Sequence, residues 1–272
     1  MIGNIFFNVL MQLIYFVGVV FLLGFLISLL NRFFYSLCNH SRGVCYATGV
    51  IGTPVHELGH ALMALLFGHK IEEIKLFQID DESGVLGYVR HSYNRKNLYQ
   101  VTGNYFIGVA PIVCGSLVVF FSMYFFAPIA YTETAWYLEA FSSAMSEGFS
   151  GNVVGYIFSL VKGIFSVLFL EISTFKWWIF IIIAMCIALH MNLSGADIKS
   201  ALGAIPILAV VLILLNLILG YLTGSFYLTY LGFVNKVGGY LIGVLSLSLI
   251  LSLLCVAVAA AVKGILRLVF RR

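Results

Sequence analysis

Residues 56–60 read HELGH, and they have the types and spacing that metal chemistry needs. His56 and His60 are four residues apart, so both imidazoles lie on one face of a helix and can direct a ring nitrogen at one ion. Glu57 stands beside them, where its carboxylate can take a proton from a water molecule at the metal. The pattern predicts a Zn²⁺ site with His56 and His60 as ligands and Glu57 as general base. The alternative is that the two histidines simply pack inside a helical bundle.

The chain around this motif is strongly apolar. Of its 272 residues, 62% are hydrophobic and only 10% are charged, whereas about a quarter of the residues of a soluble domain are charged. This composition predicts an all-α polytopic membrane protein, because a helix satisfies its backbone hydrogen bonds internally within lipid. The net charge of +4 comes from Lys and Arg near the membrane boundary, so we expect no nucleic-acid partner.

Apolar runs long enough to cross about 30 Å of hydrocarbon mark the predicted membrane helices. We expect six transmembrane helices, at residues 9–30, 48–68, 103–127, 177–195, 203–222 and 238–262. The second contains HELGH, and histidines with a glutamate inside a span favour a functional site. The first run is expected to be a retained helix, because it lacks the basic start and the cleavage site of a signal peptide.

Two connections are longer than turns. Residues 70–92 hold two stretches rich in β-branched and aromatic residues around an acidic turn at 80–84, which predicts a small β-hairpin after the HELGH helix. Residues 131–176 are mixed in character and are expected to form an interfacial segment. Within it, residues 153–170 are apolar and predict either an interfacial helix or a seventh span.

These elements divide the chain into three parts. They are an N-terminal membrane helix and loop (1–47), a core with the HELGH site, the hairpin and the interfacial segment (48–200), and C-terminal membrane helices with a basic tail (201–272). With six spans, ten of the 15 Lys and Arg residues lie on the face that carries both termini, which the positive-inside rule places in the cytoplasm. A seventh span would reverse this assignment for everything after it. Cys38 and Cys45 share one loop and could pair in an oxidising compartment.

A catalytic zinc ion needs a third protein ligand. Asp197 is the first choice, and His190 lies seven residues before it, on a common face if the helix is continuous. Residues 194–197 also form a variant of the S-x-x-D capping box, which would start a helix without any metal. His190 and Asn192 are candidates for stabilising an oxyanion or supporting the ligands, or they simply pack between helices.

Together these motifs resemble the site-2 protease family of intramembrane metallopeptidases. The resemblance rests on HELGH within a span, on GVAP at 108–111 opening the next core helix, and on Asn192 and Asp197 near the end of a later one. It implies Zn²⁺ as the cofactor, with Asp197 as third ligand, although NLSGADIK matches the family's NPDG-like motif only partly. A looser resemblance to bacterial membrane peptidases implies a bacterial cell membrane.

The resemblance implies a zinc metalloendopeptidase that cleaves transmembrane or membrane-associated protein or peptide substrates. Zn²⁺ would polarise the scissile carbonyl and activate water, while Glu57 acts as base and then as acid. An extended substrate would add as a strand to the hairpin edge at 71–77 or 85–91. The hairpin residues expected to contact it are Ile71, Ile74, Leu76, Val85, Leu86 and Tyr88.

Other interpretations of these residues stay open. The hairpin is alternatively a solvated ribbon with no part in binding. The chain is alternatively a metal-ion transporter, which would need several helices lined with His or acidic residues along a path. It is also alternatively a catalytically inactive zinc-binding membrane chaperone or binding protein, although the presence of Glu57 argues for an enzyme. The sequence leaves the substrate and the oligomeric state open.

Overall fold

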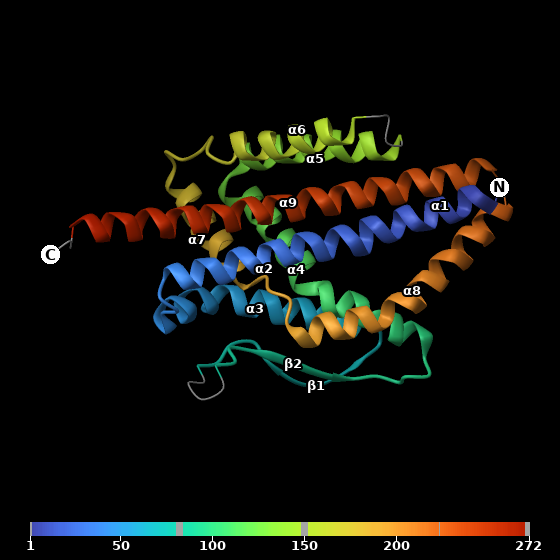
Figure 1. Ribbon diagram of the computed structural model, residues 1–272, viewed down its shortest axis with the longest axis horizontal. Helices are drawn as coiled ribbons and strands as arrows, with labels where there is room; N and C mark the ends of the chain where they lie inside the picture. Colours follow the sequence, from blue (N-terminus) through green and yellow to red (C-terminus); the bar gives the residue numbers. More distant parts are fainter. Residues whose placement is uncertain (1, 80–83, 148–151, 223, 270–272) are drawn as a thin grey trace.

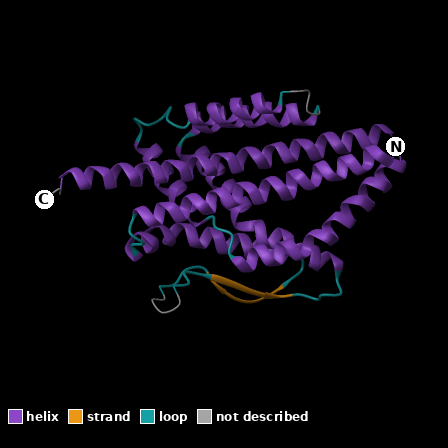
Figure 2. Cartoon of the chain, in the orientation of Figure 1, coloured by secondary structure: helices purple, strands orange, loops and turns teal. Residues whose placement is uncertain are grey.

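The computed structural model describes residues 2–79, 84–147, 152–222 and 224–269, most of which are helical (Figure 1, Figure 2). A first helical run passes without a break through an α-helix, a π-helical stretch and a second α-helix. The elements in chain order are α1 (Ile2–Leu13), η1 (Ile14–Val19), α2 (Val20–Leu37), α3 (Arg42–Leu66), β1 (Lys70–Lys75), β2 (Tyr88–Ser92), α4 (Leu98–Phe126), α5 (Pro128–Ser146), α6 (Val153–Val167), α7 (Phe175–His190), α8 (Gly195–Leu222) and α9 (Gly224–Val269).

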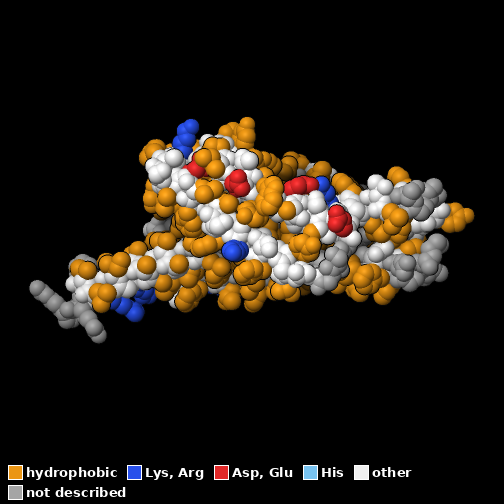
Figure 3. All heavy atoms as spheres, turned by 90° about the horizontal axis from the view of Figure 1, so that it is seen from above, with side chains coloured by type: hydrophobic (Ala, Val, Ile, Leu, Met, Phe, Trp, Pro, Cys, Tyr) orange, Lys and Arg blue, Asp and Glu red, His pale blue; other side chains and the backbone are white. Residues whose placement is uncertain are grey.

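Several of these helices have the length and composition to cross a membrane. Two further apolar helices are shorter, namely Val154–Val167 and Phe175–His190. Large apolar side chains are exposed along the helices, and they cover much of the face seen from the α5–α6 side, where charges are few (Figure 3). The chain therefore has the helices of a multi-pass membrane protein, as the composition predicts. The four long apolar runs are Ile5–Leu37, Leu98–Phe126, Gly195–Tyr221 and Phe226–Val269.

Each of the six predicted spans overlaps a helix, but only four of them overlap these long apolar runs. The predicted span 48–68 lies in α3, whose hydropathy is lowered by the polar residues of its HELGH turn. The helix at the predicted span 177–195 is shorter than expected, because α7 ends at His190. With 16 residues, α7 is about 24 Å long, which is less than the thickness of the hydrocarbon core. In contrast, α9 has 46 residues and extends beyond the predicted span 238–262 at both ends.

Residues 131–176 contain most of α5 and all of α6 instead of a single interfacial stretch. With 15 residues, α6 is about 22 Å long and too short to cross a bilayer alone. Its connection to α7 is tied back to the start of α5, since the carboxylate of Glu171 accepts hydrogen bonds from the N–H groups of Ile129 and Ala130, each at 3.0 Å. The α5–α6 pair lies along α9, at the edge opposite the hairpin (Figure 1).

The first described helix begins and the last one ends at opposite ends of the long axis (Figure 1). The prediction that both termini are cytoplasmic depends on how each helix crosses the bilayer, and it stays a prediction. Cys38 and Cys45, which share one loop and could pair, are both free thiols in the structure.

The predicted hairpin after the HELGH helix is confirmed, with shorter strands than expected. Strands β1 and β2 pair antiparallel from Lys70–Ser92 to Lys75–Tyr88, with a bulge in β1. Beyond the strands, the N–H of Gln78 donates to the carbonyl of Leu86 at 2.7 Å and continues the pairing towards the turn. Most of the predicted acidic turn, residues 80–83, lies outside the described residues.

Candidate metal centre

Helix α3 carries the HELGH residues in its second half, and two glycines let its neighbours approach closely. A Cβ added at Gly52 would lie 2.3 Å from the carbonyl oxygen of Cys186 in α7. A Cβ at Gly59 would lie 3.3 Å from the carbonyl oxygen of Ala110 in α4. Small residues of this kind allow close packing of helices. Therefore α3 is held between α4 and α7, which fixes the direction of its histidines.

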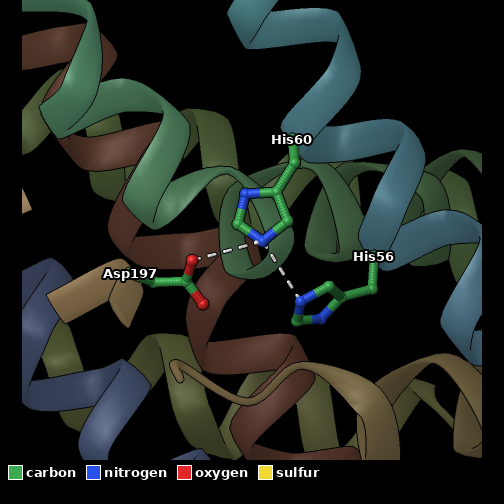
Figure 4. A group of neighbouring side chains, drawn as sticks. All are labelled: His56, His60 and Asp197. Atoms are coloured by element: carbon green, nitrogen blue, oxygen red, sulfur yellow. Dashed lines mark hydrogen bonds and ion pairs between the residues drawn. The ribbon is translucent and has the colours of Figure 1, made fainter. Parts of the chain in front are cut away.

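The three predicted ligands lie together (Figure 4). The Nε2 atom of His60 is 3.2 Å from Nε2 of His56 and 3.5 Å from Oδ1 of Asp197. Donor atoms of all three residues lie within 4.8 Å of one another. The two histidines come from successive turns of α3, and Asp197 comes from the first turn of α8. It is the one group of three such donors found among the described residues.

A proline in the neighbouring helix explains how His60 is oriented. Its Nδ1 lies 2.8 Å from the carbonyl oxygen of Ile107 in α4. In a regular helix that carbonyl would accept from the N–H four residues later, but this position is Pro111, which has no N–H. The carbonyl is therefore left for His60, whose Nδ1–H must donate to it. This leaves the Nε2 lone pair of His60 directed at the donor cluster.

His56 is oriented by another backbone carbonyl. Its Nδ1 lies 2.8 Å from the carbonyl oxygen of His190, the last residue of α7. Carbonyls in the final turn of a helix have no partner within the helix, so this one is available to a side chain. The Nδ1–H of His56 donates to it, and the Nε2 lone pair points to the same place as that of His60. Histidine ligands in metal sites are commonly held in this way.

The donor set fits a tetrahedral zinc ion. Because both Nδ1–H groups are engaged, two Nε2 lone pairs face each other at 3.2 Å with no proton between them. Such an arrangement is repulsive unless a cation lies between the nitrogens. A tetrahedral ion with ligand bonds of about 2.1 Å separates its donor atoms by about 3.4 Å. The measured distances of 3.2 and 3.5 Å agree with that separation.

Asp197 has two roles in the structure. Its Oδ2 accepts from the backbone N–H of Ser194 at 2.9 Å, while its own N–H donates to Oγ of Ser194 at 3.1 Å. This reciprocal pair caps α8, and the other carboxylate oxygen faces His60. The helix reaches this position because α4 has Gly108, where a Cβ would lie 2.6 Å from the carbonyl oxygen of Asp197. The GVAP segment thus positions two candidate ligands, Asp197 through its glycine and His60 through its proline.

Glu57 is buried, with 6% of its surface exposed, and lines two cavities. The larger, of about 510 Å³, lies between the donor cluster and strand β2. The smaller, of about 280 Å³, extends towards α2 and the start of α3. The hairpin lies close to Glu57 because residue 87 is a glycine, where a Cβ would come within 2.9 Å of Cγ of Glu57 and within 2.8 Å of Cγ2 of Thr53.

The two candidates for a supporting role lie at the smaller cavity. The ring of His190 faces α2 and α3, with Nε2 3.0 Å from Oγ1 of Thr48 and Nδ1 3.4 Å from Oγ1 of Thr53. It is the backbone carbonyl of His190, and not its ring, that contacts His56. Oδ1 of Asn192 accepts from Nδ2 of Asn31 at 3.1 Å, which ties the loop after α7 to α2. Both side chains are therefore engaged in contacts between helices.

Two of the six predicted substrate contacts line a cavity. Tyr88 lines the larger cavity and Leu86 lines the smaller one. The residues that line neither cavity are Ile71, Ile74, Leu76 and Val85. Val89 and His91 of β2 line the larger cavity, although the sequence did not single them out. The sequence placed both residues in or near the second hairpin strand. Which strand faces α3 follows only from the register of the hairpin.

The fold and the site define an apolar helical protein with an HExxH helix and a carboxylate supplied by a later helix. Residues 33–141 match the family model described as Peptidase M50B-like, which is an M50 family of the site-2 protease type. This confirms the resemblance to site-2 proteases. The match includes HELGH, the hairpin and GVAP, whereas Asp197 lies beyond it. No curated protein and no solved structure matches the chain.

Proposed function

We propose that the chain is an intramembrane zinc metallopeptidase that hydrolyses peptide bonds of transmembrane or membrane-associated substrates. The observation that carries this proposal is the convergence of two Nε2 lone pairs and one carboxylate oxygen beside a cavity that Glu57 also lines. The M50B-like match supports a metallopeptidase. The exposed apolar surface and the long apolar helices support a location within a bilayer.

The residues have separate tasks in this reaction. His56, His60 and Asp197 would hold the zinc ion, which supplies a Lewis acid for the scissile carbonyl and for water when it is bound. Glu57 takes a proton from the attacking water and gives it to the leaving amine. The carbonyls of Ile107 and His190 keep the two imidazoles in the tautomer that ligation needs.

We propose that the substrate binds along strand β2. Residues 87, 88, 89 and 91 line the larger cavity, and among the described residues β2 pairs with β1 alone. An extended peptide that pairs with the other edge of β2 would place its backbone across the donor cluster. Pairing of this kind also keeps a membrane-spanning substrate unwound, so that its amides are open to attack. This proposal favours β2 over β1, because no residue of β1 lines the cavity.

Glu57→Gln tests the proposed function directly. The change keeps the size of the side chain and removes the base, so zinc content should stay within about twofold while cleavage falls about 10²- to 10⁴-fold. Membrane proteins trapped by the tagged Glu57→Gln chain would be incubated with purified wild-type protein, and new termini would be identified by mass spectrometry. Glu147→Gln, a change at an exposed carboxylate distant in sequence, is the matched control.

Two outcomes of this experiment contradict the proposal. Cleavage that survives Glu57→Gln with zinc bound would exclude Glu57 as the base. Purified wild-type protein that binds no zinc would exclude a metallopeptidase. Zinc flux into liposomes would instead support a transporter, although the described residues contain one three-donor group and not a series of them.

A further inference from the structure

His91 lies outside the HELGH motif but faces the same cavity. It belongs to β2, where it pairs with Ile71 of β1, and it lines the 510 Å³ cavity together with the three donors and Glu57. Because the same residues line this cavity, His91 lies on the side of the hairpin that faces the donor cluster. Neither the metal site nor the proposed general base accounts for a histidine here.

A chain of hydrogen bonds fixes the proton positions of His91. Nε2 of His69 lies 2.8 Å from the carbonyl oxygen of Gln100, so this nitrogen must carry the hydrogen. In the neutral ring, Nδ1 of His69 is then an acceptor. Nδ1 of His91 lies 3.0 Å from it and must donate. With both rings neutral, Nε2 of His91 has no hydrogen and offers a lone pair.

The surroundings hold this arrangement in place. His69 is buried, with 3% of its surface exposed, and its ring stacks on Tyr93 at 4.9 Å between centroids. Burial, followed by the neighbouring His69, lowers the pKa of His91, which favours the neutral ring at pH 7. Among the described residues, no group forms a hydrogen bond with Nε2 of His91. An acceptor of fixed direction is therefore present at the wall of the cavity.

We propose that Nε2 of His91 accepts a hydrogen bond from a backbone N–H of the peptide substrate. An extended peptide beside β2 offers such groups at regular intervals, and an acceptor on the cavity wall sets which residue lies at the donor cluster. The side chain of His91 thus supplements the backbone pairing of the strand edge. His69 is a positioning residue, because it holds the ring of His91 through its Nδ1. This inference rests on the proposed peptidase function.

The simpler role of the His69–His91 pair is structural. The pair joins the end of β2 to the segment after α3 and, through Gln100, to the start of α4. Loss of activity in a His91 variant would fit both roles. A test must therefore detect the hydrogen bond to the peptide itself.

Peptide hydroxamates that either keep or lack one backbone amide N–H provide that test. The probes are N-acetyl-leucyl-leucine hydroxamate and its two analogues methylated at one leucyl amide nitrogen. Binding is measured on zinc-loaded full-length protein in detergent. In the wild type, one analogue should bind about 5- to 10-fold more weakly than the parent, as expected for one lost hydrogen bond. In His91→Phe the penalty should fall to within about twofold, because the acceptor is gone.

Further variants separate positioning from folding. His91→Gln should keep part of the penalty, since the amide oxygen can accept, and His69→Phe should reduce it, since His91 loses its orienting partner. His40→Gln, at an exposed histidine in the turn after α2, should retain the full penalty. Zinc content should stay within about twofold in each variant, because none of these side chains is a proposed ligand.

The results test the role of His91 separately from the proposed peptidase function. An equal penalty in the wild type and His91→Phe, or no penalty in the wild type, overturns the role of His91 while the metallopeptidase site stands. Failure of the wild type to bind zinc or the parent hydroxamate overturns the proposed function, and the role of His91 with it. A penalty lost in His91→Phe and kept in His40→Gln supports the hydrogen bond.

Discussion

Oδ1 of Asp197 lies 3.5 Å from Nε2 of His60, while Oδ2 of the same carboxylate accepts the backbone N–H of Ser194 at 2.9 Å. One side chain therefore both caps α8 and faces the imidazole of α3. The capping interpretation and the ligand interpretation of residues 194–197 are compatible, because they use different oxygens. The cap also removes rotational freedom from the carboxylate, which prepares it for an ion.

Asp197→Asn separates these two roles. The amide oxygen can still accept from the N–H of Ser194, so helix α8 should remain, but the negative charge facing His60 is lost. We expect zinc affinity to fall by at least about 100-fold, because an anionic ligand is replaced by a weak neutral one. Competition with a chelator on purified protein measures the affinity, and circular dichroism measures the helix.

Ser194→Ala is the companion to that change. It removes the hydroxyl that accepts from the N–H of Asp197, at a cost of about 1 kcal/mol in helix stability. The carboxylate stays, so zinc affinity should fall less than about tenfold. Asp197→Asn with unchanged zinc affinity would remove Asp197 from the site.

Pro111→Ala tests the orientation of His60. An alanine supplies the N–H that the helix lacks, and this N–H competes with His60 for the carbonyl of Ile107. Zinc affinity should drop about tenfold, as when a partner that orients a histidine ligand is lost. The helix itself should become more stable, because proline is the least favourable residue in a helix interior.

Pro206→Ala in α8 is the control for Pro111→Ala. It restores the same kind of N–H in another helix, and no ligand histidine hydrogen-bonds to the carbonyl that it would engage. Its zinc affinity should stay that of the wild type. A Pro111→Ala protein that also keeps full affinity would show that the free carbonyl of Ile107 is not needed.

The sequence predicted the parts of the site that lie within one element. The spacing of His56 and His60 brings both onto one helix face, whatever the rest of the fold does. The hairpin followed from local residue types, and the long apolar runs followed from composition. Asp197 was chosen by its residue type and its place in the chain, although residues 194–197 also allowed the capping interpretation.

Relations between elements could not be predicted in the same way. The role of Pro111 depends on which residue of α3 packs against the carbonyl of Ile107, and that is a tertiary contact. The position of His91 at the cavity depends on the register of the hairpin and on the distance between the hairpin and α3. The length of α7 was overestimated, because the apolar residues Met191 and Leu193 follow the end of the helix at His190.

Gly108→Ala should move α8 away from α4. The added Cβ would lie 2.6 Å from the carbonyl oxygen of Asp197 and 2.9 Å from Cβ of Ala201, so the first turn of α8 must shift. We expect zinc affinity to fall about 10- to 100-fold, since the carboxylate moves with the helix. Gly203→Ala is the control in α8, because nothing lies within 4 Å of its added Cβ. Equal affinities of the two variants would contradict the close approach.

Gly87→Ala tests whether the hairpin must lie against Glu57. The added Cβ would meet Thr53, Glu57 and the carbonyl oxygen of Lys75 at 2.8 to 2.9 Å, and two of these contacts belong to α3. The start of β2 must therefore move away from the helix, which widens the cavity above the donor cluster. The three donors do not contact Gly87, so zinc content should stay within about twofold.

The Gly87→Ala change should lower the cleavage activity although it leaves the zinc content nearly unchanged. Because the edge of β2 no longer lies at the donors, cleavage of a substrate trapped by Glu57→Gln should fall about 10²-fold, as for a misplacement of about 1 Å. The loss should appear mainly in kcat/KM at low substrate. Gly18→Ala, where an added Cβ meets nothing within 4 Å, should cleave at the wild-type rate. Full activity in Gly87→Ala would mean that the substrate does not use β2, because a strand displaced from Glu57 cannot hold a peptide across the donors.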